Sequence, residues 1–163
     1  MSASILWRRV RAVGDVAQRM AIEMVSTVYA VVVLALVEAT IRWVPLPRLS
    51  SLLGCPVELS PSTSGPVIPS SHELGRRARR ELRCTQRVAD AWPLSRGPCL
   101  RRALVGGHLL RRLGTSIRLG TYDDGESLVA HAWLEIEGRP LEDVSNYRRF
   151  ESGATTTTEE PLA

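Results

Sequence analysis

The longest pattern of apolar positions lies near the start of the chain and predicts a helix. Over residues 5–43, apolar side chains recur every three or four positions, which is the spacing of one helical face. No charged residue occurs between Met24 and Val37, so the second half of this helix can be buried on all sides. Pro45 stops the helix, and a short amphipathic piece follows at 49–53.

Breaker residues divide the chain into four regions. Residues 55–71 are rich in proline, serine and threonine, which predicts a linker. The linker separates an N-terminal helical region, 1–54, from a core at 72–150. Four consecutive threonines predict a disordered tail at 151–163.

Within the core, the periodicity changes from helical to alternating. Residues 72–92 predict an amphipathic helix whose six arginines form either a solvated face or a docking surface for an acidic peptide. A second helix is expected over 98–113. Alternation over 116–122, 128–136 and 140–144 predicts an antiparallel meander of three strands. Helices followed by a small sheet make the fold class α+β.

Charge and cysteine content narrow the function. The chain has 163 residues and a net charge of +4, and all 21 of its cationic side chains are arginine. This excess is too small to predict nucleic-acid binding. Three cysteines, Cys55, Cys84 and Cys99, and three histidines lack the spacing of a metal site, so we expect neither metal nor cofactor. Unpaired thiols indicate a reducing compartment, and we expect a cytoplasmic protein.

The sequence does not decide whether the N-terminal helix contacts a membrane. Arginines precede the apolar run, as in a signal peptide, but no clean cleavage site follows. The uncharged run 24–37 has 14 residues, whereas a bilayer span needs about 20. The pattern favours a buried or interfacial helix, with membrane contact through 24–37 as the alternative.

Cys99 is a candidate nucleophile because it lies at a predicted helix start. It follows Gly97 and Pro98, and proline is favoured at the first helical position. The unpaired N–H groups and the positive end of the helix dipole both stabilise a thiolate there. The alternative for this residue is a small core side chain.

His131 and Asp143 complete a candidate triad. His131 lies in a predicted strand, on the face opposite Ala132. Asp143 lies on the next strand across a hairpin, where a carboxylate can orient the imidazole. Alternation turns Glu142 to the other face. Taken singly, a surface histidine and a strand-end aspartate remain alternatives.

A nucleophile at a helix start, a base on a strand and an acid on the next strand is the order of papain-like cysteine catalysis. Over about residues 80–150 the chain resembles the transglutaminase-like leader peptidases of lasso-peptide biosynthesis, the B proteins. The segments that carry the resemblance are Pro98–Leu104, Leu109–Gly114, Ile117–Gly120, Ala130–Glu135, Gly138 and Asp143.

The resemblance implies a fold, an activity and partners. The fold is a papain/transglutaminase-like core with an N-terminal helical extension. The activity is a cysteine peptidase with Cys99 as nucleophile, His131 as general base and Asp143 as orienter, which removes the leader from a ribosomally made lasso precursor peptide. A separate ATP-dependent cyclase then closes the ring. The first 70 residues lack the early strands of a leader-recognition domain, so the chain resembles the split form, which uses a discrete recognition protein.

Two features stay open at this stage. Backbone N–H groups at the helix start would hold the oxyanion, and the second donor is Trp92, Arg96 or Gln86. The alternative functions are a thiol acyl transferase of the transglutaminase type, a non-catalytic scaffold for the cyclase, and a membrane-tethered adaptor.

Overall fold

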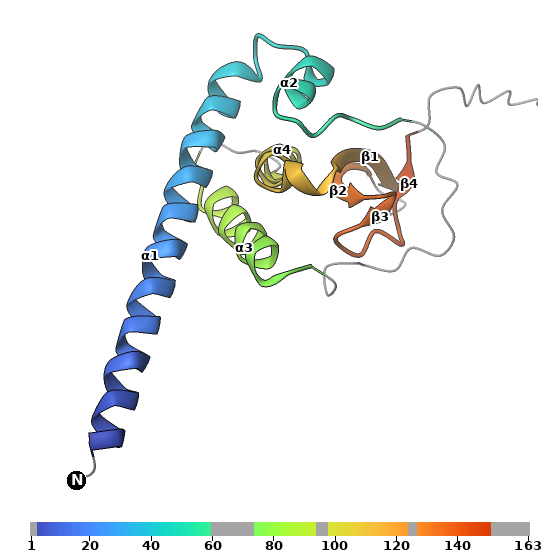
Figure 1. Ribbon diagram of the computed structural model, residues 1–163. Helices are drawn as coiled ribbons and strands as arrows, with labels where there is room; N and C mark the ends of the chain where they lie inside the picture. Colours follow the sequence, from blue (N-terminus) through green and yellow to red (C-terminus); the bar gives the residue numbers. More distant parts are fainter. Residues whose placement is uncertain (1–2, 60–73, 94–97, 124–126, 151–163) are drawn as a thin grey trace, which may run out of the picture.

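The computed structural model describes residues 3–59, 74–93, 98–123 and 127–150, and its elements form three layers. Figure 1 shows the long helix α1 on one side, α3 and α4 in the middle, and a small sheet on the other side. This mixture of helices and a small antiparallel sheet confirms the predicted fold class. The bounds are α1 Ala3–Thr40, α2 Leu46–Leu52, α3 Arg76–Asp90, α4 Pro98–Leu110, β1 Thr115–Asp123, β2 Leu128–Ile136, β3 Arg139–Pro140 and β4 Arg148–Arg149.

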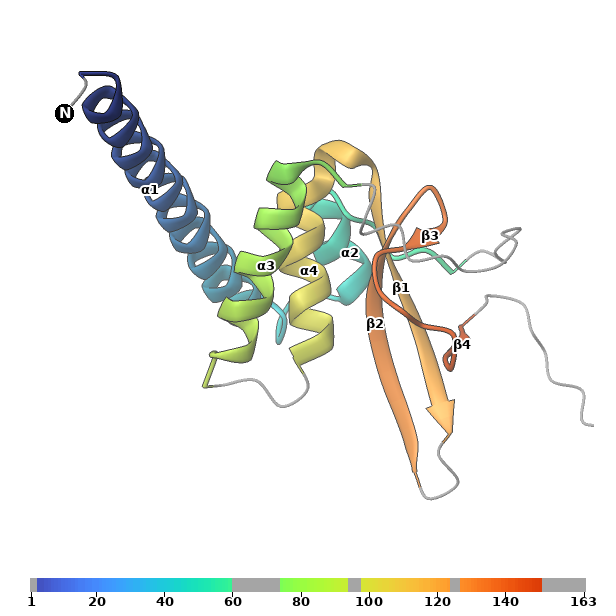
Figure 2. The same ribbon diagram turned by 90° about the horizontal axis from the view of Figure 1, so that it is seen from below.

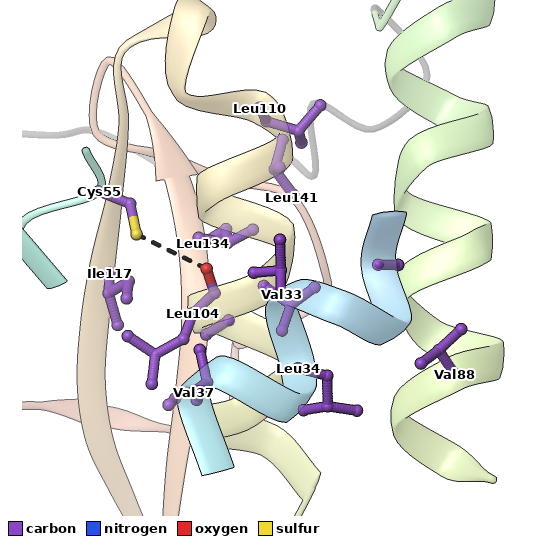
Figure 3. Close-up of a cluster of buried hydrophobic side chains, with 14 of the residues drawn as sticks. Val33, Leu34, Val37, Cys55, Val88, Leu104, Leu110, Ile117, Leu134 and Leu141 are labelled. Carbon is purple, nitrogen blue, oxygen red and sulfur yellow. Dashed lines mark hydrogen bonds between the residues drawn. The ribbon is translucent and has the colours of Figure 1, made fainter. Parts of the chain in front are cut away.

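Helix α1 belongs to the core rather than to a separate unit. Its residues Ala30, Val33, Leu34 and Val37 are buried against α3 and α4. They join a single apolar cluster with side chains from every layer (Figure 3). The labelled members of that cluster are Val33, Leu34, Val37, Cys55, Val88, Leu104, Leu110, Ile117, Leu134 and Leu141. The predicted N-terminal region is therefore helical but shares its core with the rest of the chain.

The first residues of the predicted linker also belong to the fold. Val57 forms a parallel bridge with Ile117, and the Ile117 N–H donates to the Pro56 carbonyl at 2.8 Å. Cys55 is fully buried and its thiol donates to the Leu104 carbonyl. Residues 55–59 thus form part of the sheet edge, because their backbone groups pair with β1. Residues 60–71 of the predicted linker and the predicted tail 151–163 lie outside the described residues.

The sheet differs from the predicted meander at both edges. Its strand order is β3-β2-β1-β4, and β1 and β2 pair antiparallel along their whole length. The predicted third strand, 140–144, ends already at Pro140, and the chain then crosses to the other edge to form β4. Gly120 makes this crossing possible, because a Cβ there would lie 2.5 Å from the Arg148 carbonyl oxygen.

Candidate active site

Cys99 lies in the first turn of α4, where the sequence predicted it. Two ion pairs fix this end of the helix. Arg101 forms a two-pronged pair with Glu38 of α1, and Arg102 donates to Asp90 at the end of α3. The Arg101 guanidinium holds the pKa of the Glu38 carboxyl below its usual value. The start of α4 is therefore attached to both neighbouring helices.

Cys99 and His131 line one small pocket, with a volume of about 50 Å³. It lies between α3, α4, β2 and the chain after β3. Its lining residues are Leu82, Thr85, Gln86, Cys99, Arg102, Ala103, His131, Ala132, Trp133, Leu134, Leu141 and Glu142. The structure thus brings two of the three predicted catalytic residues to one cavity.

His131 is held between aromatic rings at a partly exposed position. Its ring stacks on Tyr147 with a centroid distance of 4.7 Å, and the Trp133 ring lies 6.1 Å away. The His131 side chain is 19% exposed, so water and substrate can reach it. Strand β3 pairs with β2 only at Glu135 and Ile136. On that edge of β2, His131 therefore has no neighbouring strand among the described residues.

Glu135 anchors the same strand from a fully buried position. It accepts hydrogen bonds from Arg118 Nε at 3.1 Å and Trp133 Nε1 at 3.0 Å, and it pairs with Arg149 at 3.1 Å. A buried carboxylate needs such partners, since desolvation otherwise costs several kcal/mol. Because Trp133 packs near His131, this network also restrains the imidazole.

The carboxylate beside His131 is Glu142, not the expected Asp143. The His131 Nε2 atom and the Glu142 Oε1 atom are 3.4 Å apart. Asp143 is exposed, and its Oδ1 accepts the Ser145 N–H at 3.1 Å, which holds the pKa of its carboxyl below the usual value. The expected contact of Asp143 with His131 assumed a strand through 144, and the catalytic role of Asp143 stays a prediction. The chain leaves the strand after Pro140, so alternation no longer sets the faces.

A sequence signal for this bend was present. An Asp side chain readily accepts the backbone N–H of the residue two positions later, which forms an Asx turn and interrupts a strand. Asp143 and Ser145 make this contact. Glu142 is therefore the functional candidate that sequence reasoning missed.

The candidate oxyanion donors occupy different places. Gln86 of α3 lines the pocket with Cys99. Trp92 is partly buried against the apolar cluster and is not one of the residues that line this pocket. Arg96 lies outside the described residues. Of the two candidates that the structure describes, Gln86 is the one that lines the pocket with Cys99.

Cys99 differs from the other two cysteines in accessibility. Cys55 and Cys84 are buried, and burial raises the pKa of Cys55 to about 12. His108 of α4 is also remote from this chemistry, since its ring nitrogens contact the Leu53 carbonyl and the Tyr29 hydroxyl. In the described parts of the chain, no three His, Cys, Asp or Glu side chains are grouped to bind a metal ion.

Comparison with known proteins gives one match. The family model described as "Transglutaminase-like superfamily" matches residues 33–155, a range that contains every residue of the pocket. No curated protein and no solved structure matches the chain.

Proposed function

The chain belongs to the transglutaminase-like superfamily, and from this premise we propose that it is a cysteine peptidase that removes the leader from a lasso precursor peptide. The superfamily includes cysteine proteases and acyl transferases. The observation that carries the proposal is the pocket shared by Cys99, at a helix start, and His131, on the facing strand. This arrangement suits a thiol nucleophile and its base.

The proposed reaction has two steps. His131 accepts the proton of the Cys99 thiol as the sulfur attacks the scissile carbonyl carbon, and the resulting oxyanion accepts hydrogen bonds from N–H groups at the start of α4 and from Gln86. The C–N bond breaks as His131 donates a proton to the departing amine, which leaves a thioester on Cys99. His131 then takes a proton from water, the hydroxide attacks the thioester, and the leader carboxylate and free thiol are released.

A carboxylate is needed to orient His131 and to stabilise the imidazolium. The distance of 3.4 Å favours Glu142, whereas the resemblance to leader peptidases implies Asp143. Because Glu142 and Asp143 are neighbours in one bend, substituting each in turn distinguishes their roles.

The lasso assignment rests on the motifs around the pocket residues. Within this proposal, the substrate is the precursor peptide, a discrete recognition protein presents its leader, and a cyclase uses the amine that cleavage releases. The pocket is small, which suits recognition of substrate residues near the cut by a limited surface while a partner binds the remainder.

The decisive experiment is incubation of the full chain with the lasso precursor peptide, with and without the recognition protein, followed by mass spectrometry. We expect cleavage at one peptide bond, absent in Cys99→Ala and retained in the matched control Cys84→Ala. Cleavage by Cys99→Ala at the wild-type rate would contradict the assignment. An amide formed with an added primary amine, in place of a carboxylate, would identify an acyl transferase instead.

A further inference from the structure

One side of α1 is apolar and exposed over much of its length. We call this surface the outer face; its residues are Met20, Met24, Val25, Val28, Val31, Val32 and Leu36. At 100° and 1.5 Å per residue they span an arc of about 160° and a length of about 24 Å. Each is at least 39% exposed, and most are exposed by half or more. Figure 1 shows α3 and α4 along one side of α1, and the buried Ala30, Val33, Leu34 and Val37 pack against them.

This pattern is the opposite of that expected for a surface helix whose outer side faces water. A helix that covers a soluble core has polar side chains on its outer side. Glu23, the acidic residue between Met20 and Leu36, and Glu38, two positions after Leu36, instead contact other helices: Glu38 pairs with Arg101, and Glu23 lines a groove with arginines of α3. The outer face therefore has no charge of its own, and contiguous apolar surface of this kind marks an interaction site.

An arginine and an exposed tryptophan lie at one end of the outer face. Arg42 and Trp43 follow its C-terminal end, and the Trp43 side chain is 85% exposed. Arginine beside an exposed tryptophan at the end of an apolar stretch is typical of the lipid headgroup region, and a cation at the membrane surface favours anionic lipids. The arginines of α3 do not add to this contact, because they line a groove with Arg19 and Glu23 on the side of α1 that faces α3.

We propose that the outer face of α1 binds the surface of a membrane that contains anionic lipids, with the helix axis parallel to the membrane. An arc of about 160° is wider than the seam by which one helix packs on another, and it offers no charge to fix a protein partner. By length and composition alone, Gly14–Thr40 could cross a bilayer. However, a spanning helix would have to release Val33, Leu34 and Val37 from the core, so the packed helix lies in the interface.

This orientation leaves the candidate active site in water. The pocket is lined by α3, α4, β2 and the chain after β3, and α1 contributes no residue to it. In Figure 2, α3 and α4 separate α1 from the sheet. Membrane binding would thus confine the protein to the bilayer surface without covering Cys99. The inference stands independently of the proposed peptidase activity.

The test is sedimentation of the full chain with vesicles of phosphatidylcholine, alone or mixed with phosphatidylglycerol. We expect clear binding to the mixed vesicles, weaker binding to phosphatidylcholine alone, and weakening by salt. The double variant Val28→Glu/Val32→Glu should bind at least about tenfold more weakly, because it replaces two apolar side chains that would enter the membrane by charges that anionic lipids repel. Leu128→Glu is the control: this residue is 70% exposed on the sheet, far from α1, and its substitution likewise replaces an exposed apolar side chain by a negative charge, one where the double variant adds two.

Circular dichroism establishes that each variant is folded, as expected for exposed sites. Absence of wild-type binding to the mixed vesicles would overturn the proposal, as would equal binding by the double variant and Leu128→Glu. A dimer in light scattering that the double variant abolishes, without vesicle binding, would identify a second copy as the occupant and would also overturn it.

Discussion

Strand β2 contacts a carboxylate near each of its ends, and the two carboxylates differ in burial and in the number of their partners. At the C-terminal end, Glu135 is fully buried and contacts Arg118, Arg149 and Trp133 at 3.0–3.1 Å. At the His131 end, Glu142 is 39% exposed and lies 3.4 Å from the imidazole. The first arrangement fixes the positions of its side chains, since the partners of a buried carboxylate cannot be exchanged for water at low cost. The second leaves room for protons, water and a peptide to exchange.

Trp133 connects these two ends. Its indole N–H donates to Glu135, and its ring lies against the rings of His131 and Tyr147. The fixed end of the strand can therefore restrain the open end through one side chain. This comparison leads to the expectation that substitutions at Glu135 change stability, whereas those at the His131 end change chemistry.

The largest effect is expected from Glu135→Gln. It removes the negative charge between the buried Arg118 and the partly buried Arg149, and breaking a buried ion pair costs about 3–5 kcal/mol. Urea unfolding should show this loss in the free energy of unfolding. Glu137→Gln, a neighbouring exposed site, is the control and should change stability by less than about 0.5 kcal/mol. Equal stability of the two variants would mean that the network does not hold the sheet.

A smaller effect, confined to activity, is expected from Glu142→Gln. Loss of the carboxylate that orients the base should lower kcat by about 100-fold, within the range of general acid–base contributions. The free energy of unfolding should stay unchanged, because the pair is partly exposed. Peptide cleavage kinetics of Glu142→Gln and Asp143→Asn separate the two carboxylates. A large loss in Asp143→Asn with normal activity in Glu142→Gln would assign the role to Asp143.

The smallest effect is expected from Gly120→Ala, on strand β1 beside β2. Gly120 is opposite His131 in the β1–β2 register, and an added Cβ would approach the Trp133 ring to 2.7 Å. Overpacking of this kind costs about 1–3 kcal/mol, so the thermal midpoint should fall. Gly14→Ala on α1 has open space around it and should be neutral or slightly stabilising. A neutral Gly120→Ala would show that β4 packs less tightly than described.

Local patterns predicted the elements that depend on neighbouring residues. The helices, the β1–β2 pair and the place of Cys99 follow from periodicity and from Pro98, which acts within a few residues. The contact of Glu142 with His131 was missed because it depends on a bend after Pro140. The pairing of β4 with Gly120 was missed because two residues carry no recognisable alternation. The burial of Cys55 depends on contacts with residues about 50 positions away, which no local pattern encodes.

The most direct test of the account is the alkylation rate of each cysteine by chloroacetamide at neutral pH, followed by peptide mapping. If Cys99 and His131 act in one pocket, Cys99 is modified at least about tenfold faster than buried Cys55 and Cys84, and His131→Ala slows Cys99 modification about tenfold while leaving the other two unchanged. An unchanged Cys99 rate in folded His131→Ala would contradict the pairing on which the proposed chemistry depends.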